Sequence, residues 1–567
     1  MSYSQLLNGD HKTKLSINDE FYYLAKAQTA LAEGDLNLVL DNLVKADAIV
    51  PDEIEIIASI RSIQAQLGLW KEMLPTVDLL INLQPDEVEW RCQRLSGLMG
   101  CKAYENVVQE APPLLDVYPN HLTILSYLAT SYYHTNRFSR SLEAANTLIE
   151  LKATNSQYLF LRGLNYRAMG DAERAKIELL KAESFDDSNV AIVNALGALH
   201  VDSYEHDIAL TYFCKALALD NGTQLSHPIA FNASFSAFCL GKFDKGWQFY
   251  AYRKYLGVKG EAIYPAWQGE SLSGKHLVVR TEQGLGDHLR FASVIHEIAT
   301  EAKLVTLECE PRLIDLYERS FPKNVELIGA DVNFHGDSYV GVDCAAHIGD
   351  LSHYKRRSLD DFPEHCGFLQ PDPVRVKYWT DYLSKFDGQV NVGVCWKSGN
   401  TKGIRNLYYT DMEHWLPVFL IEGINFVNLF YGDGEDDLRW VKAKTGVEVH
   451  TPIGIDLKND IDDLSALIAS LDLVVGPHTA CLDLAMAVKG ASAWVLPFHS
   501  SSTSPYFYFG QVYFPWAPAA KPVHGDGFEE TMKVVAEELA YITQDKDPKL
   551  TLAEISKVMY ACYGMDE

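Results

Sequence analysis

The segment Gly34–Pro51, GDLNLVLDNLVKADAIVP, is followed at a spacing of 34 residues by Gly68–Pro85, GLWKEMLPTVDLLINLQP, and Pro119 stands another 34 residues on. Turn formers repeat at the same spacing, in Lys102-Ala103-Tyr104, Asn136-Arg137-Phe138 and Gly170-Asp171-Ala172. A turn former at the bend between two helical segments, and a proline, Asp187 or Asn221 after the second segment, predict a solenoid of helical hairpins.

The repeat continues beyond these copies. We expect an irregular turn near Tyr204, after which the series resumes at Gly241-Lys242-Phe243 with three extra residues. The period and pattern resemble the tetratricopeptide repeat, and about seven copies over residues 17–254 would stack into one continuous core. The resemblance implies a groove that holds a protein or peptide segment. A purely structural or dimerising solenoid is the alternative.

A different pattern begins near Tyr255. Residues 255–274 are rich in glycine, which predicts a connector. Short β-branched runs then alternate with helical stretches, as is typical of buried parallel sheet. The first set of candidate strands is His276–Arg280, Leu304–Cys309, Val325–Ile328 and Tyr339–Val342, and the second set is Asn391–Trp396, Asn425–Phe430, Val447–His450, Leu471–Val475 and Ala493–Leu496.

A polar stretch near Phe362–Gly388 separates the two sets of strands. We therefore expect an α/β fold of two Rossmann-like lobes after the α-solenoid, with lobes at residues 275–388 and 389–545 and a ligand in the cleft between them. Apolar spacing predicts a helix over Phe528–Ile542. A further helix over Leu550–Tyr563 is expected in the tail, residues 546–567.

The composition excludes several classes of protein. The 567 residues carry 49 Lys and Arg against 76 Asp and Glu, a net charge of −27, which argues against generic nucleic-acid binding and favours solubility. Ten cysteines form no CxxC pair, so we expect neither a zinc cage nor a disulfide framework, and a cytoplasmic location. Neither a long apolar run nor an N-terminal apolar segment occurs, so no membrane span or secretory signal is expected.

The first candidate site is Glu282-Gln283-Gly284-Leu285-Gly286-Asp287-His288, directly after the first candidate strand. Gly284 and Gly286 let the backbone approach a ligand closely, and the N-terminus of the following helix favours an anion. Asp287 falls in the first turn, where a carboxylate can accept a proton from an attacking hydroxyl. The alternative is that Asp287 only caps the helix.

A second cluster, Trp396-Lys397-Ser398-Gly399-Asn400 with Lys402 and Arg405, follows the first strand of the second set. Three cations and a hydroxyl within nine positions suit a diphosphate. A solvated basic loop is the alternative.

Two more clusters follow later strands. Phe430-Tyr431-Gly432-Asp433-Gly434 offers a ring and a close backbone for a nucleobase, or forms a simple turn. Gly476-Pro477-His478-Thr479-Ala480 opens a helix whose N-terminus could bind phosphate, with Asp483 one turn on, or His478 serves only as a cap. No HExxH, Walker A, GxSxG or metal-spaced Cys/His motif is present, which disfavours metal-dependent hydrolysis and P-loop ATP hydrolysis.

Several motifs in register resemble bacterial tetratricopeptide proteins fused to a glycosyltransferase, whose catalytic part is similar to the lipopolysaccharide heptosyltransferases and the O-linked N-acetylglucosamine transferases. The motifs are Gly246-Trp247-Gln248-Phe249-Tyr250, Pro265-Ala266-Trp267-Gln268-Gly269, Glu282–Asp287, Trp396–Gly399 with Arg405-Asn406, Asn428–Asp433 and Leu464–Leu496. The resemblance covers nearly the whole chain in the same order. It implies a GT-B fold and metal-independent, inverting transfer from a nucleotide-sugar.

The resemblance also implies roles for individual residues. Asp287 would be the catalytic base. Lys397, Ser398 and Arg405 would hold the donor phosphates, and Tyr431 would lie near the base of the nucleotide. Thr479 and Ala480 would offer a helix N-terminus to the phosphates.

The sequence departs from the pattern in one place. Many relatives read Asp-Thr-Ala followed by His-Leu-Ala, where this chain has His478-Thr479-Ala480 and Asp483-Leu484-Ala485. The acid and the imidazole are exchanged. This exchange would preserve a pair of side chains while changing the contact with the donor, so the resemblance leaves the identity of the donor open.

Members with this architecture include enzymes that glycosylate flagellin, with a repeat domain that recruits flagellin and a donor that is a CMP-activated nonulosonic acid. The resemblance therefore implies a protein O-glycosyltransferase, with flagellin as the favoured acceptor and UDP- and GDP-sugars left open as donors. A non-catalytic scaffold is the first alternative. A glycan or glycolipid transferase is the second, and the lack of an evident basic amphipathic membrane helix disfavours it.

Overall fold

The computed structural model describes residues 20–152, 154–220, 222, 225–256, 263–282, 284–330, 339–362, 367–399, 409–496, 514–517, 520–523, 525 and 527–545. The chain divides into two compact units, Met1–Met169 and Gly170–Glu567, so the division falls inside the repeats. The domain boundaries predicted from the sequence remain predictions. Among the described residues, no helix combines the length and the apolar character needed to cross a membrane.

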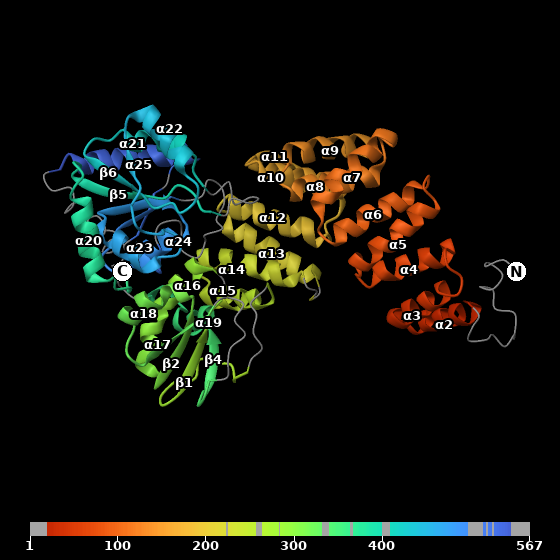
Figure 1. The fold of residues 1–567 in the computed structure, drawn as a ribbon, viewed down its shortest axis with the longest axis horizontal. Helices are drawn as coiled ribbons and strands as arrows, with labels where there is room; N and C mark the ends of the chain where they lie inside the picture. The colour runs from red at the N-terminus through yellow and green to blue at the C-terminus, as the bar shows by residue number, and fades with distance from the viewer. Residues whose placement is uncertain are drawn as a thin grey trace. The chain divides into compact units, whose positions relative to one another are not determined.

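The repeats form fourteen helices in the described residues, in seven successive pairs joined by short turns, and the boundary between the two units falls within the fifth pair (Figure 1). The pairs are α2 (Glu20–Glu33) and α3 (Leu36–Asp47), α4 (Ile54–Gln66) and α5 (Trp70–Leu83), α6 (Val88–Gly100) and α7 (Tyr104–Val117), α8 (Leu122–His134) and α9 (Phe138–Leu151), α10 (Ser156–Ala168) and α11 (Ala172–Phe185), α12 (Val190–Asp202) and α13 (His206–Asp220), and α14 (Ser226–Cys239) and α15 (Phe243–Tyr250). The predicted solenoid of tetratricopeptide repeats is confirmed.

The bend inside each pair is made by one residue in the left-handed conformation. These residues are Gly34, Gly68, Lys102, Asn136, Gly170, Tyr204 and Gly241, with φ between 57° and 81°. The next N–H donates to the carbonyl five positions earlier, as in Asp35 to Ala30 (3.0 Å) and Glu205 to His200 (2.8 Å). This is the Schellman arrangement that ends a helix.

The turn at Tyr204 is therefore regular, and our expectation of an irregular turn there is wrong. Tyr204 has φ 58° and lies at the same spacing as the other bend residues. The sequence does not indicate a regular turn at Tyr204, because tyrosine rarely adopts a positive φ. The three extra residues lie between Tyr204 and Gly241, around the junction of α13 and α14.

The first sheet of the second unit has the strand order β3-β2-β1-β4, with every pair parallel. Its strands are β1 (His276–Arg280), β2 (Leu304–Cys309), β3 (Val325–Gly329) and β4 (Cys344–His347). The helices α16 (Leu285–Phe291), α17 (Ile295–Glu301), α18 (Ile314–Ser320) and α19 (Ile348–Lys355) gather around this sheet (Figure 1).

The strand predicted at Tyr339–Val342 is wrong, because the chain pairs with β1 only from Cys344 onward. Val340 is 94% exposed, and Gly341 takes a left-handed turn with φ 73°. Cys344 instead turns its side chain into the apolar core. Of the two neighbouring apolar runs, the one that is buried against β1 forms the strand.

The second sheet has the order β10-β9-β8-β5-β6-β7, again parallel throughout. Its strands are β5 (Val390–Val394), β6 (Ile424–Asn428), β7 (Val449–His450), β8 (Leu473–Pro477), β9 (Ala493–Leu496) and β10 (Lys521–Pro522), and its helices are α20 (Pro373–Leu383), α21 (Leu416–Phe419), α22 (Glu435–Thr445), α23 (Ile461–Ser470), α24 (Ala480–Ala487) and α25 (Gly527–Thr543). Both sheets follow the Rossmann strand order, in which the direction of winding reverses beside the first strand of the lobe. The predicted fold of two Rossmann-like lobes is confirmed and is consistent with GT-B.

The polar stretch near Phe362–Gly388 that separates the two predicted sets of strands contains a helix, α20. Its Trp379 is almost fully buried, and its indole Nε1 donates to Asp463 of α23 at 2.8 Å. The predicted C-terminal helix Phe528–Ile542 is confirmed as α25, whereas the predicted tail helix at 550–563 lies outside the described residues.

The last helix of the solenoid shares its core with the first lobe. Trp247 of α15 is 3% exposed, and its Nε1 donates to the carbonyl of Arg356 at 2.6 Å. Its ring contacts Phe291 of α16 edge-on and Trp516 from the second lobe. This packing fixes α15 to both lobes within the second unit.

Candidate active site between the two lobes

Asp287 lies on α16, close behind the carboxyl end of β1. Gly284 occupies the N-cap position of α16, with no side chain bonded to the cap. Asp287 therefore does not cap the helix. Its carboxylate Oδ1 accepts a hydrogen bond from Nη1 of Arg290, one turn along the same helix, at 2.9 Å. The side chain of Asp287 keeps 28% of its surface exposed, so a substrate hydroxyl can reach it.

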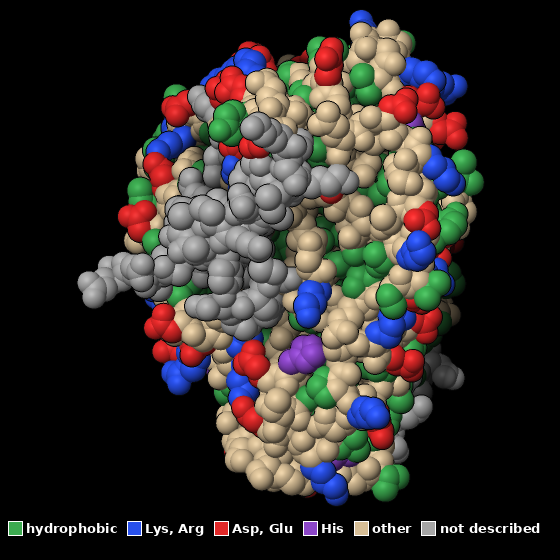
Figure 2. All heavy atoms as spheres, turned by 90° about the vertical axis from the view of Figure 1, so that its left-hand side faces the viewer, with side chains coloured by type: hydrophobic (Ala, Val, Ile, Leu, Met, Phe, Trp, Pro, Cys, Tyr) green, Lys and Arg blue, Asp and Glu red, His purple; other side chains and the backbone are tan. Residues whose placement is uncertain are grey.

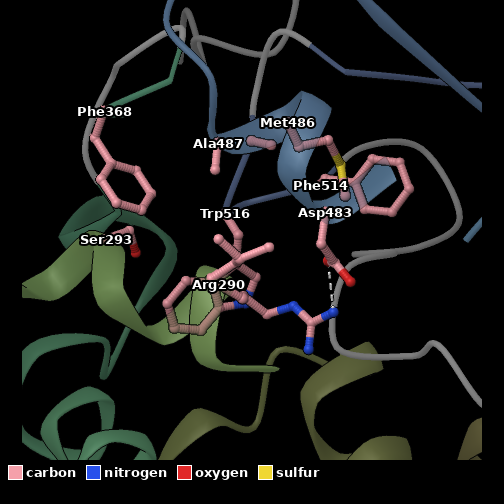
Figure 3. A pocket seen from close by; sticks show the side chains of 10 residues that line it. Arg290, Ser293, Phe368, Asp483, Met486, Ala487, Phe514 and Trp516 are labelled. Atoms are coloured by element: carbon pink, nitrogen blue, oxygen red, sulfur yellow. Dashed lines mark hydrogen bonds and ion pairs between the residues drawn. The ribbon is translucent and has the colours of Figure 1, made fainter. Parts of the chain in front are cut away.

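Arg290 joins the two lobes. Its Nη2 donates to Oδ1 of Asp483 on α24 at 2.8 Å, and Nε2 of His478 lies 3.0 Å from the same oxygen. Figure 3 shows the contact between Arg290 and Asp483 at one end of a pocket. Arg290 and Asp483 are almost completely buried, so this is a desolvated, hydrogen-bonded ion pair.

The pKa values of the two carboxyl groups are shifted in opposite directions. Burial raises the pKa of Asp287 most strongly, and the negative charges of Asp483 and Glu282 raise it further, while Arg290 opposes the rise. Burial would also raise the pKa of Asp483, but Arg290 and His478 outweigh it and hold this pKa below its ordinary value. A pair of neighbouring carboxyl groups with opposite shifts is typical of catalytic sites.

Gly286 is the point where α16 approaches α24. A Cβ atom at Gly286 would lie 2.3 Å from Oδ2 of Asp483, whereas a Cβ at Gly284 would meet nothing within 4 Å. Gly286 thus allows the close approach of the two helices. Of the two glycines named from the sequence, only Gly286 is required by packing in the described structure.

The N-terminus of α24 lies at the carboxyl end of β8. Thr479 is its N-cap residue, with no side-chain cap hydrogen bond, and Ala480 is its first residue. His478 and Asp483 contact each other, so the exchanged acid and imidazole do form a pair. Oγ1 of Thr479 lies 3.8 Å from Sγ of Cys395, at the end of the neighbouring strand β5.

Lys397 follows β5 and already has an anionic partner. Its Nζ lies 2.6 Å from Oδ2 of Asp437 in the first turn of α22, and 5.3 Å from the ring centre of Phe430. The indole Nε1 of Trp396 donates to the same carboxylate oxygen at 2.9 Å. A phosphate group at Lys397 would therefore share this lysine with Asp437.

Tyr431 follows β6, the neighbour of β5. Its hydroxyl accepts a hydrogen bond from the backbone N–H of Gly399 at 3.2 Å, so the loops after the two strands are joined. Ser398 lies in the same loop, and Arg405 lies outside the described residues. The structure thus brings Lys397, Ser398 and Tyr431 to one edge of the second sheet.

A pocket lies beside the contact of Arg290 with Asp483 (Figure 3). Its lining comes from both lobes and is mainly apolar, with Leu289, Arg290, Ser293, Phe368, Asp483, Met486, Ala487, Phe514, Trp516 and Ala517. Oγ of Ser293 is buried there without a hydrogen-bond partner.

Neither Arg290 nor this pocket was predicted from the sequence. The spacing of three residues between Asp287 and Arg290 indicates an ion pair on one helix face. The contact with Asp483 joins residues 193 positions apart, and no local pattern indicates it.

Figure 2 shows one face of the molecule. Over the described residues on that face, Lys and Arg side chains are interspersed with Asp and Glu, and no continuous basic field is present. This face therefore gives no indication of a nucleic-acid interface.

The fold defines the class: the chain is a tetratricopeptide-repeat protein with a C-terminal parallel α/β region. No family model matches the chain. Protein FlbA of Caulobacter vibrioides (strain ATCC 19089 / CIP 103742 / CB 15) is 32% identical over 347 residues, which are 58% of this chain and 54% of FlbA. The chain thus spans about half the length of this curated relative.

Solved structures match the repeats with low similarity. YrrB, described as a TPR protein with an unusual peptide-binding site, is 12% identical with a TM-score of 0.27, covering 31% of this chain and 92% of YrrB. The Cut9–Hcn1 assembly of the APC/C is 14% identical with a TM-score of 0.33, covering 42% of this chain and 47% of that chain. These scores are too low to support an argument about function.

Proposed function

We propose that the protein is an inverting, metal-independent O-glycosyltransferase that moves a sugar from a nucleotide-activated donor to a Ser or Thr hydroxyl of a protein. The observation that carries this proposal is Asp287, a partly exposed carboxylate on α16 that is paired with Arg290, which also binds Asp483 of the second lobe. The family resemblance of the motifs supports the same assignment.

In the proposed reaction, the carboxylate of Asp287 takes the proton from the acceptor hydroxyl as its oxygen attacks the anomeric carbon. The bond between that carbon and the donor phosphate oxygen breaks, and its electron pair leaves with the nucleotide. Lys397 and the N-terminus of α24 at Thr479 would stabilise the negative charge on the leaving phosphate. Arg405 would add a second cation.

The position of Asp483 gives the exchanged pair a role in this scheme. In this chain the acid faces Arg290 of the first lobe, and His478 precedes the α24 N-terminus. We infer that Asp483 holds the two lobes together through Arg290, and that His478 is the member of the pair placed toward the donor.

The repeat solenoid would recruit the acceptor, since stacked repeats present an extended binding surface. Flagellin is the acceptor that the resemblance favours, and a CMP-activated nonulosonic acid is the donor to test first. UDP- and GDP-sugars complete the donor panel.

The test is a transfer assay followed by intact-protein mass spectrometry. The full-length protein would be incubated with the host's flagellin and the panel of CMP-, UDP- and GDP-sugars. We expect a mass increment with one donor that Asp287→Ala abolishes. Asp315→Ala is the matched control, because Asp315 lies in the first turn of α18, exposed and away from the site.

Other outcomes would contradict parts of the proposal. Flagellin binding without transfer from any donor would favour a non-catalytic scaffold. Neither binding nor transfer would reject flagellin as the acceptor. Transfer that persists in Asp287→Ala would remove Asp287 from the role of base.

A further inference from the structure

Glu282 is a buried carboxylate between β1 and α16, five residues before Asp287. Arg253 binds both of its oxygens, with Nε 2.9 Å from Oε2 and Nη2 2.6 Å from Oε1. The backbone N–H of Gly349 donates to Oε1 at 2.8 Å. An arginine that binds both oxygens fixes the direction of a carboxylate as well as its place.

Arg253 lies just after the last repeat, in the short 3-10 helix η1 (Ala251–Leu256) that continues α15. It is buried, and its Nη2 also lies 2.9 Å from Oδ1 of Asp350 on α19. Its Nη1 donates to the carbonyl of Tyr250 at 3.3 Å, and its guanidinium lies 4.4 Å from the centre of the Tyr250 ring. These contacts hold the arginine in one orientation.

The same end of the repeat region also contacts the far end of α16. Phe291, the last residue of this helix, lies against Tyr250 and Trp247, with ring centres 5.8 and 6.5 Å away. The arginine reaches the chain ahead of the helix, and the two rings reach its last residue. Asp287 lies in the first turn, between these two points. Residues 247–253 therefore hold the helix that carries the proposed base at both of its ends.

The charges around Arg253 are balanced. Arg253 faces two carboxylates, Glu282 and Asp350, and Lys254 supplies a second cation, 2.7 Å from Oδ2 of Asp350. Nδ1 of His347 lies 3.9 Å from the same oxygen, and burial lowers the pKa of His347, so the imidazole adds no charge near neutral pH. Asp350 therefore keeps a cation of its own when Arg253 is replaced.

Gly349 shows how little room the Glu282 carboxylate has. A Cβ atom at Gly349 would lie 2.7 Å from Oε1 of Glu282 and 2.9 Å from Nη2 of Arg253. The glycine therefore permits both contacts at once, and a side chain there would displace the carboxylate without changing any charge. Close packing on every side leaves the carboxylate little freedom to move.

We propose that the end of the repeat region positions the base of the transfer reaction, and that Arg253 is the positioning residue, acting through Glu282. This inference rests on the proposed function, in which Asp287 is the base. Replacing a buried ion pair by apolar residues often leaves stability unchanged, so the geometry imposed on Glu282 is the better reason for the arginine. The repeats then contribute to the transfer step itself, in addition to recruiting the acceptor.

The first test compares kinetic constants of full-length variants with the donor and acceptor that give transfer. Arg253→Met should lower kcat by about 10- to 100-fold, as expected when a base is misplaced by about 1 Å. The KM for the donor should change little, because the residues proposed to hold the donor lie on the second lobe. Arg253→Lys should regain part of the rate, because it returns the charge and one hydrogen bond.

Arg356→Met is the matched control. Arg356 is also buried, and its carbonyl accepts from Trp247 at the same junction, but its guanidinium binds Glu297 and does not contact Glu282. Its kcat should change much less than that of Arg253→Met. An equal loss of kcat in the two variants would indicate general loosening of the lobe and would overturn the inference.

Two further variants separate position from charge. Gly349→Ala changes no charge but displaces the Glu282 carboxylate, so its kcat should fall as in Arg253→Met. The double variant Arg253→Met with Glu282→Gln removes both charges of the pair and leaves Asp350 with Lys254. It should remain slow, because the contact between η1 and the chain after β1 is missing. Recovery of the full rate in the double variant would show that only an unpaired carboxylate had slowed Arg253→Met, and would overturn the inference.

Amide hydrogen exchange provides a readout that needs no transfer. In Arg253→Met the amides of α16 should exchange at least about 10-fold faster, whereas Arg356→Met should leave them nearly unchanged. Faster exchange without transfer from any donor would support the contact between Arg253 and the helix while the proposed function fails. Transfer with unchanged kcat and unchanged exchange in Arg253→Met would leave the glycosyltransferase proposal intact and overturn this inference.

Discussion

Removing Arg290 should shift the pH dependence of transfer toward higher pH. Asp287 must lose its proton to act as a base, so activity on the acid side rises as pH passes through its pKa. The pKa is already raised by burial, and Arg290 opposes that rise. In Arg290→Met the attraction is lost while the repulsion from Asp483 and Glu282 stays, so the pKa rises further.

The size of the shift follows from the contact. Opposite charges at 2.9 Å in an effective dielectric of about 20 attract by about 6 kcal/mol, which is a ceiling of about 4 pKa units. The charge centres lie farther apart than the nearest atoms, and Arg290 also serves Asp483. A single neighbouring cation usually shifts a carboxyl pKa by about 1–3 units, so we expect about 1–2 units here.

The assay is the pH profile of kcat/KM with the donor identified by mass spectrometry, because this parameter reports groups of the free enzyme. Arg290→Lys should restore part of the shift, since it returns the charge without the second hydrogen bond. Arg319→Met is the matched control. Arg319 also joins the lobes, through an ion pair with Asp462, but it does not contact Asp287.

Two results would refute this reasoning. An acid limb in Arg290→Met that coincides with the unmodified protein would show that Arg290 does not tune Asp287. An equal shift in Arg319→Met would show that the effect comes from looser lobes rather than from the charge beside the carboxylate.

Three further outcomes are expected. Gly286→Ala should lower kcat/KM by about 100-fold with little change in fold, because the new Cβ would lie 2.3 Å from a carboxylate oxygen of Asp483 on α24. Gly284→Ala is the control and should leave kcat/KM nearly unchanged, because a Cβ there meets no atom within 4 Å. Equal activities of the two variants would contradict the close approach of α16 and α24. Lys102→Gly should raise the free energy of unfolding in urea by about 0.5–1 kcal/mol, because Lys102 is exposed and has φ 57°; a loss of stability would show that the lysine side chain matters more than the strain. Asp437→Asn should tighten binding of the donor nucleotide by up to about fivefold in calorimetry, because it removes the ion pair that holds Lys397. Weaker binding would instead show that the Asp437 carboxylate positions Lys397 for the phosphate.

Much of the fold could be predicted because its signals are local. Bend residues at a fixed spacing and apolar stripes on short helices define the solenoid within each repeat. The strands β1, β2 and β9 are continuous apolar runs whose predicted bounds agree with the structure, whereas the predicted bounds of β5, β6, β7 and β8 differ by one to two residues at one or both ends and β10 was not predicted. The exception at Tyr339–Val342 shows the limit, because two adjacent runs had the same local character and only pairing with β1 chose between them.

The sequence also placed candidate residues correctly at strand ends. Asp287, Lys397 and His478 each follow a strand, and this is a local property of the chain. Their chemical surroundings could not be predicted in the same way. Lys397, which we expected to bind phosphate, is paired with Asp437. Asp437 lies on α22, which follows the next strand, β6.

The sequence by itself determined the repeat, the two parallel sheets and the strand ends where chemistry is expected. The repeat period and the pattern of apolar residues are local properties, because each depends only on residues close together in the sequence. Only the tertiary structure decided which of those ends meet. Arg290 contacts Asp483 from 193 residues away, and Glu282 binds Arg253 from 29 residues away. Electrostatic contacts of this kind depend on distances between separate elements, and no single stretch of sequence contains those distances.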